Sequence, residues 1–154
     1  MALNSDQISR VLSAILHRSH YFGAVSFQDL PLTVKKYPFC VVINSAPKNE
    51  FYGHWVCIFA ENKYDGVYFD SFGIAPWGRI YDFITGNITS AIFNRRLLQS
   101  FQSEVCGFYC ILVLKNLDAG MGLAEILSQF SDDVIENDTK VTLKVRRLIS
   151  ALEV

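Results

Sequence analysis

The sequence predicts an α+β fold in which helices pack around a small, mostly antiparallel sheet. Three observations lead to this expectation. A chain of 154 residues that is 51% hydrophobic can bury about two thirds of its surface around one core, so residues 1–154 are expected to form a single domain. The short β-branched run Phe39–Asn44 is typical of a buried strand. The almost continuously apolar run Cys106–Leu117 is typical of a central buried helix.

An amphipathic helix is expected near the N-terminus. Apolar side chains recur there at helical spacing, at Ile8, Val11, Leu12, Ile15 and Leu16. Ser5 is the expected N-cap, because its hydroxyl can accept from an unpaired N–H of the first turn. The mixed stretch from Gly23 to Pro38 predicts no regular element, and the strand Phe39–Asn44 follows it.

The strand-like runs His54–Ala60 and Gly66–Asp70 are expected to form a hairpin. A short polar segment separates them, and its Asp65-Gly66 dipeptide favours a tight turn. In an antiparallel hairpin the start of the first strand lies beside the end of the second. We therefore expect His54 and Asp70 to lie within reach of an imidazole–carboxylate hydrogen bond.

The second half of the chain predicts further helices and one more strand. A short helix is expected around Ile80–Ile84 and a strand over Ala91–Leu98. Two helices, Leu123–Phe130 and Thr139–Leu152, are expected after the central helix. The last one has an apolar face made by Val141, Val145, Leu148 and Leu152, and a basic face made by Lys140, Lys144 and Arg147. Acidic residues precede it, which suits the sign of a helix dipole.

Composition excludes several classes of protein. With 14 Lys+Arg against 15 Asp+Glu, the formal charge of −1 supplies no general basic field for nucleic acid. No apolar run approaches the roughly 18 residues of a membrane span. The first residues lack the pattern of a secretory signal, so the protein is expected not to be secreted and its four cysteines are expected to be free thiols.

Cys106, His54 and Asp70 are the candidate nucleophile, base and orienting acid. Cys106 begins the predicted buried helix, where unpaired N–H groups and the positive end of the dipole favour a thiolate. His54 beside it would accept the thiol proton, and Asp70 would hold the imidazole in one tautomer. The oxyanion needs donors as well: the Cys106 backbone N–H is one, and the side-chain amide of Gln99 or Gln102 is the other.

Each of these residues also has a structural interpretation. A lone histidine on an apolar strand is often a core residue, a cysteine at a helix start is often packing, and an aspartate at a strand end is often a turn residue. A zinc site from His54 with Cys57 and Cys106 with Cys110 is disfavoured, because residues three apart on a strand point to opposite faces. No metal is expected. Cys40 and Cys57 are interpreted as core thiols.

Three blocks of residues occur in a recognisable order: Gly53-His54-Trp55, then Tyr68–Gly73, then Gln99–Cys110. In these blocks and their neighbours the sequence resembles the adenovirus-type (adenain-like) cysteine proteases and their relatives encoded by Polinton/Maverick-like elements and related DNA viruses. These proteases are of the same clan as the ubiquitin-like deconjugating proteases. The resemblance covers most of the chain up to about residue 118.

The resemblance implies an adenain-like, papain-related fold and a role for each site residue. Cys106 would be the nucleophile and His54 the general base and acid. Asp70 would be the third member of the triad. Gln99 matches the oxyanion-hole glutamine by its distance before the cysteine, with Gln102 as the alternative. Trp55 and Gly107 would line a narrow substrate cleft.

The activity implied is hydrolysis of a peptide bond through an acyl-enzyme, after a small residue such as glycine. Viral precursor proteins would be the substrates and capsid maturation the role, in the host nucleus, the virion or the cytoplasm, by a monomer. A ubiquitin-like deconjugating protease is the neighbouring alternative. An acetyltransferase or an inactive interaction domain on the same fold is a more distant one.

The resemblance also bears on cofactors. Adenain is stimulated by DNA and by a peptide that forms a disulfide to the enzyme. In this sequence no cysteine lies between Asp70 and Cys106, where that linkage would form. No cofactor is therefore expected to be required, and stimulation by DNA is expected to be weak unless Lys140, Lys144 and Arg147 bind it.

Overall fold

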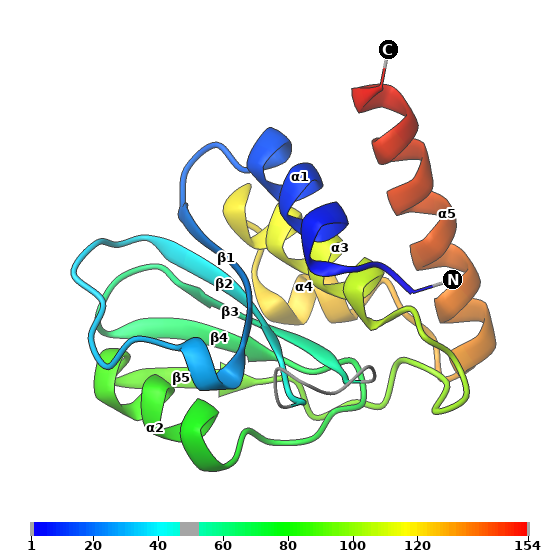
Figure 1. Ribbon diagram of the computed structural model, residues 1–154. Helices are drawn as coiled ribbons and strands as arrows, with labels where there is room; N and C mark the ends of the chain where they lie inside the picture. The colour runs from blue at the N-terminus through cyan, green and yellow to red at the C-terminus, as the bar shows by residue number, and fades with distance from the viewer. Residues whose placement is uncertain (1, 47–52, 154) are drawn as a thin grey trace.

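The computed structural model describes residues 2–46 and 53–153 and has an α+β fold. A five-stranded sheet in the order β1-β2-β3-β4-β5 carries helices on both faces (Figure 1). In chain order the elements are α1 (Ser5–Ile15), β1 (His20–Ser26), the 3-10 turn η1 (Phe27–Asp29), β2 (Phe39–Asn44), β3 (Trp55–Ala60), β4 (Asp65–Phe69), α2 (Gly78–Asn87), β5 (Ser90–Phe93), α3 (Cys106–Asp118), α4 (Leu123–Leu127) and α5 (Val134–Leu152).

The middle of the sheet is antiparallel and its two edges are parallel. β3 runs antiparallel to both β2 and β4, whereas β1 is parallel to β2 and β5 is parallel to β4. The expected fold class is confirmed, but the sheet is mixed rather than mostly antiparallel. A parallel neighbour needs a crossover connection, which α2 provides between β4 and β5.

The sheet separates two hydrophobic clusters. One face packs against α1, α3, α4 and α5, with the fully buried Tyr109 of α3 at its centre. The other face packs against η1 and α2, around the fully buried Phe39. α3 is buried on nearly all sides, as its uniform apolar sequence predicts, and Figure 1 shows it between the sheet and α5.

The N-terminal region differs from expectation in two ways. The N-cap of α1 is Asn4, not Ser5: the Asn4 side chain accepts from the Gln7 N–H, and the Gln7 side chain accepts in return from the Asn4 N–H. β1 lies in a stretch for which no element was predicted. Its residues are half-buried, and its pairing is irregular around Gly23, whose φ is +125°, so no alternating pattern marks it in the sequence.

Other boundaries also need correction. Asp65 and Gly66 lie inside β4, and the turn is made by the polar residues before them, where the Glu61 N–H donates to the Asp65 carbonyl. β5 is shorter than the expected strand. It ends at Phe93 because the Asn94 amide group turns to donate to the Asp70 carbonyl.

The helices in the second half differ from expectation in length. α2 is longer than the expected Ile80–Ile84 helix, and α4 ends at Leu127 rather than Phe130. α5 begins at Val134, before the expected Thr139, because the Asp133 carboxylate accepts from two N–H groups of the first turn. No helix within residues 2–46 and 53–153 combines the length and apolar character that crossing a membrane would require.

Asp118 fastens the end of α3 to the segment that enters β1. Its carboxylate accepts from the backbone N–H groups of His17, Arg18 and Ser19 and from the Ser19 hydroxyl. Partial burial opposes the charge, but these hydrogen bonds outweigh it and lower the pKa of Asp118.

Candidate active site

A cavity of about 600 Å³ opens where β3 begins, β4 ends and α3 begins. Its walls combine the ends of these elements with the N-terminal segment. The lining residues are Ala2, Leu3, Asn4, Ser5, Asn44, Gly53, His54, Trp55, Phe72, Gln99, Phe101, Ser103, Glu104 and Cys106. Residues from five parts of the sequence therefore meet in one cleft.

His54 and Asp70 are joined by a short hydrogen bond. The antiparallel register of β3 and β4 sets Cys57 opposite Phe69, so the segment before β3 and the segment after β4 lie at the same end of the hairpin. His54 Nε2 lies 2.6 Å from Asp70 Oδ1, and the two side chains are only 18% and 7% exposed. The same Oδ1 accepts from the Phe72 N–H at 2.8 Å, which fixes the carboxylate. The expected hairpin and its end-to-end contact are confirmed.

Cys106 is the first residue of α3 and lines the same cavity. The Trp55 N–H donates to its Sγ at 3.3 Å. No side chain caps the start of α3. The N–H groups of its first turn therefore lack a side-chain acceptor at the end of the helix that borders the cleft.

The imidazole of His54 has a raised pKa. Burial lowers the pKa, but hydrogen bonds to Asp70 and Cys106 and the negative charges of both groups outweigh burial and raise it to about 9. Asp70 takes Nε2, which leaves Nδ1 as the ring nitrogen for Cys106. His54 therefore interacts with both the carboxylate and the sulfur, and both interactions raise its pKa.

Two aromatic rings support His54, and sequence reasoning missed both. The Phe72 ring stacks on the imidazole at a centroid distance of 4.2 Å and an angle of 14°. Phe101 lies 4.9 Å from Phe72 and is 68% exposed. Phe72 follows closely after Asp70 in the chain, so its place near the site could have been inferred. Phe101 comes from a separate loop and has no such signal.

Gln99 lies in the cleft and Gln102 does not. Gln99 is 1% exposed and lines the cavity, whereas Gln102 is exposed and lies outside the lining. The Gln99 side chain is held at both ends: Oε1 accepts from the Ser71 hydroxyl at 2.5 Å, and Nε2 lies 3.1 Å from both the carbonyl and the hydroxyl of Ser103. Its position suits an oxyanion donor better than that of Gln102.

Trp55 lines the cleft, whereas Gly107, which was also expected to line it, does not. The Trp55 indole N–H donates to the Leu3 carbonyl at 3.1 Å, so the N-terminal segment forms one wall of the cavity. Gly107 is buried and is absent from the lining. A Cβ on Gly107 would stand 3.1 Å from Ile8 and 3.4 Å from Leu3 and Trp55. The absence of a side chain at Gly107 therefore leaves room for the N-terminal segment. Sequence spacing gave no means of predicting that this segment forms a wall of the cleft.

The other three cysteines do not line the cleft. Cys40, Cys57 and Cys110 are at most 1% exposed. Burial raises the pKa of Cys40 to about 12, and burial together with the neighbouring Cys57 raises that of Cys110. Within residues 2–46 and 53–153, no three His, Cys, Asp or Glu side chains are placed to share a metal ion.

The predicted basic face divides between two environments. Lys144 and Arg147 are exposed and line a groove of about 490 Å³ between α3 and α5, together with Lys115. Lys140 instead donates to the Gln129 carbonyl at 2.5 Å and lies over the Phe130 ring. This groove is separate from the residues of the cleft.

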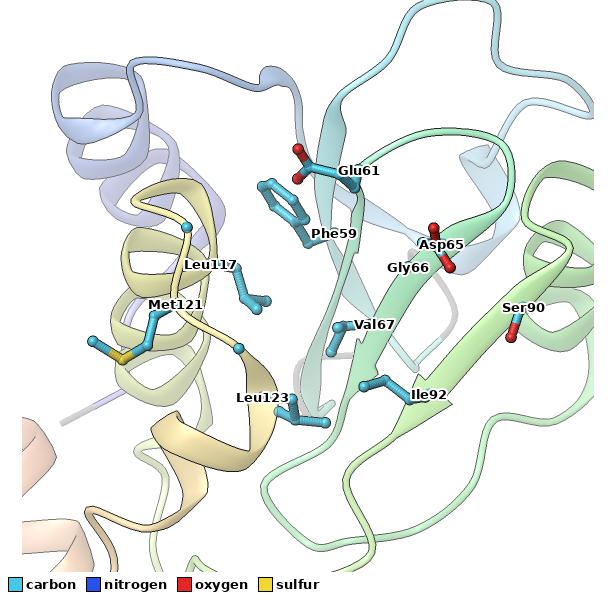
Figure 2. Close-up of a pocket in the computed structure, with 12 residues that line it drawn as sticks. Phe59, Glu61, Asp65, Gly66, Val67, Ser90, Ile92, Leu117, Met121 and Leu123 are labelled. Carbon is cyan, nitrogen blue, oxygen red and sulfur yellow. The ribbon is translucent and has the colours of Figure 1, made fainter.

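A further cavity of about 260 Å³ lies between the sheet and the segment that links α3 to α4. Figure 2 shows Val67, Ile92 and Leu123 converging on it from the two sides. Among the described residues that line it, the ionisable ones are Glu61 and Asp65, and none is a cysteine or a histidine.

Comparison with solved structures identifies the fold. The ASFV pS273R protease superposes with a TM-score of 0.61 and 14% identity, over 91% of this chain and 66% of that one, so this chain matches just under two thirds of the protease's length. The central domain of the uncharacterized Lpg1148 protein from Legionella pneumophila superposes with a TM-score of 0.56 and 13% identity, over 99% of both chains. No family model and no curated protein matches the sequence. At these identities the likeness concerns the fold alone.

Proposed function

We propose that this protein is an adenain-like cysteine endopeptidase with Cys106 as nucleophile, His54 as general base and acid, and Asp70 as the orienting acid. The observation that carries the proposal is that His54 and Cys106 line one cleft and that Asp70 contacts His54 from behind the lining. His54 lies 2.6 Å from Asp70 and shares a hydrogen bond with the sulfur at the start of α3. A likeness of fold to a protease supports the same reading.

Acylation would begin with the thiolate–imidazolium pair. The Cys106 thiolate attacks the scissile carbonyl carbon and forms a tetrahedral intermediate whose oxygen carries the negative charge. His54 then donates its Nδ1 proton to the leaving amine, the carbon–nitrogen bond breaks, and the new amino terminus leaves. Asp70 on Nε2 keeps the ring oriented so that Nδ1 is the nitrogen that transfers the proton.

The oxyanion would be stabilised by two donors. One is the Cys106 backbone N–H at the uncapped start of α3. The other is the Gln99 side-chain amide, which is buried beside it. Donors held in place before the reaction stabilise the developing charge without reorganisation, and such a donor typically contributes about 10²- to 10³-fold in rate.

Deacylation would return the enzyme to its starting state. Neutral His54 takes a proton from water, the hydroxide attacks the thioester carbon, and the carbon–sulfur bond breaks to release the carboxylate product. The sulfur departs as thiolate and the proton stays on His54. The thiolate–imidazolium pair is thereby restored.

A small residue such as glycine before the scissile bond suits the recessed nucleophile. Cys106 is only 7% exposed and lies against Trp55 and His54, so a long side chain on the acyl residue would meet these groups. We further propose viral structural precursors as substrates and capsid maturation as the role. This part rests on the resemblance of the three sequence blocks to viral proteases.

A cleavage assay tests the proposal. The pure protein is incubated with Gly-Gly peptides, capsid-precursor peptides and ubiquitin-like fusions, each with and without DNA, beside the variant Cys106→Ala. Cleavage of the peptides by the wild type alone supports a maturation protease. Cleavage of the fusions alone supports a deconjugating protease. Absence of cleavage in every arm overturns the proposed activity.

A further inference from the structure

We infer that Ser71 is a positioning residue that sets the orientation of the Gln99 amide. The inference deepens the proposed protease function and rests on it. Ser71 follows Asp70 and is 1% exposed, as is Gln99. The Ser71 Oγ donates to Gln99 Oε1 at 2.5 Å, a buried contact between residues 28 positions apart in the chain.

The orientation of an amide matters because its two ends have opposite hydrogen-bonding roles. Only Nε2 can donate to an oxyanion, and a flipped amide would turn the Oε1 lone pairs toward the negative charge. The Ser103 carbonyl can only accept, so Nε2 faces it at 3.1 Å. Oε1 must then face Ser71, whose hydroxyl can supply the donor that Oε1 needs.

One N–H of Gln99 remains for the cleft. The two acceptors near Nε2, the carbonyl and the hydroxyl of Ser103, belong to a single residue. One N–H shared between these two acceptors leaves the second N–H for another partner. Gln99 lines the cavity with Cys106, so this second N–H is the one that would meet the oxyanion.

Ser71 is itself held rigidly. Its carbonyl accepts from the Leu98 N–H at 2.9 Å and from the Gln99 N–H at 3.2 Å, so backbone and side chain both tie it to the segment that carries the amide. On its other side, the Asp70 carbonyl accepts from Asn94 at 2.7 Å. The segment that carries the triad acid and the segment that carries the oxyanion donor are therefore joined through Ser71.

A double-mutant cycle tests the inference. Ser71→Ala should lower kcat by about tenfold, with KM and the alkaline limb of the pH profile unchanged, because the amide loses its orientation while His54 keeps its partners. Ser71→Thr, which restores the hydroxyl, should recover most of the loss. In a Gln99→Ala background the same Ser71→Ala change should cost nothing further. An equal cost in both backgrounds, or no loss from Ser71→Ala alone, overturns the inference.

Controls separate positioning from stability. Ser19→Ala also removes a hydroxyl hydrogen bond, to Asp118 far from the cleft, and should leave kcat unchanged. Thermal unfolding is measured for each variant. If Ser71→Ala fails to fold, Ser71→Cys fills the same space with a weak donor and should show the same loss of kcat.

A second readout keeps the inference falsifiable if the wild type cleaves nothing. The side-chain amide signals of Gln99 are followed by ¹⁵N NMR in the wild type and the two variants. Ser71→Ala should shift or broaden them, whereas Ser19→Ala should not. Unmoved signals in Ser71→Ala overturn the positioning role whatever the activity. A protein with shifted signals and no peptidase activity refutes the proposed function alone.

Discussion

The charge of Asp70 should set the alkaline limit of activity, and Asp70→Asn is the perturbation that tests it. The amide keeps an oxygen that can accept from His54 Nε2 and from the Phe72 N–H, so the geometry survives while the charge is lost. His54 and Asp70 are 18% and 7% exposed, so water screens the pair poorly. A hydrogen bond to a charged partner contributes about 1.5–3 kcal/mol.

That contribution predicts the size of the effect. In the wild type the pKa of His54 is raised from 6.5 to about 9, which corresponds to about 3 kcal/mol in favour of the imidazolium. Without the Asp70 charge this pKa should move back toward 6.5. At pH 9 the wild type should keep about half of its plateau kcat/KM, whereas the variant should fall about 10- to 100-fold below its own plateau.

The same shift has a consequence for stability that does not require activity. Because the folded pKa of His54 lies above the ordinary value, the stabilisation is complete below pH 6.5 and is lost as pH rises through about 9. The free energy of unfolding of the wild type should therefore decline across this window, and that of Asp70→Asn should decline much less. Asp82→Asn, on the exposed face of α2, is the matched control.

The measurements are kcat/KM against a cleavable peptide from pH 5 to 10, and urea unfolding over the same range. An alkaline limb that stays near pH 9 in Asp70→Asn would show that the raised pKa has another origin. An unchanged slope of stability with pH would lead to the same conclusion.

Three further predictions follow from the contacts of single residues. Iodoacetamide should alkylate Cys106 in the folded protein and leave Cys40 and Cys110 unmodified until denaturant is added, because burial raises the pKa of the latter two; peptide mapping checks this, and equal labelling of all four thiols would count against a nucleophilic Cys106. Gln99→Ala should lower kcat by about 10²-fold and Gln102→Ala by less than about twofold, since only Gln99 lines the cleft; the reverse order in steady-state kinetics would transfer the oxyanion role to Gln102. Asp118→Asn should lower the free energy of unfolding at pH 7 by about 2 kcal/mol, and the deficit should shrink as pH falls through the lowered pKa of Asp118; a urea titration beside Asp82→Asn measures it, and a deficit independent of pH would exclude the carboxylate charge as its source.

Local patterns were sufficient for the central elements of the fold. The bounds of Phe39–Asn44 match β2, because a short β-branched run has few alternatives to a buried strand. α3 begins at Cys106 as expected, because an apolar run of that length can be buried only as a central helix. β1 was missed because a half-buried edge strand interrupted near Gly23 carries no periodic signal.

The candidate site was predictable where it depended on the hairpin. Antiparallel pairing alone brings His54 to Asp70, and the sequence contains both strands. The sequence alone did not decide which glutamine lines the cleft, because Gln99 and Gln102 lie in one loop. Only the packing of that loop buries Gln99 and exposes Gln102.

By itself, the sequence determined the α+β class, the helix that presents Cys106 and the hairpin that joins His54 to Asp70, because each depends on contacts between neighbouring segments. Tertiary structure decided the rest of the cleft: the wall made by Leu3 on Trp55, and the Ser71 hydroxyl on Gln99. These contacts join segments far apart in the chain, and their formation depends on how the layers of helices close over the sheet. No periodicity or spacing encodes such a contact.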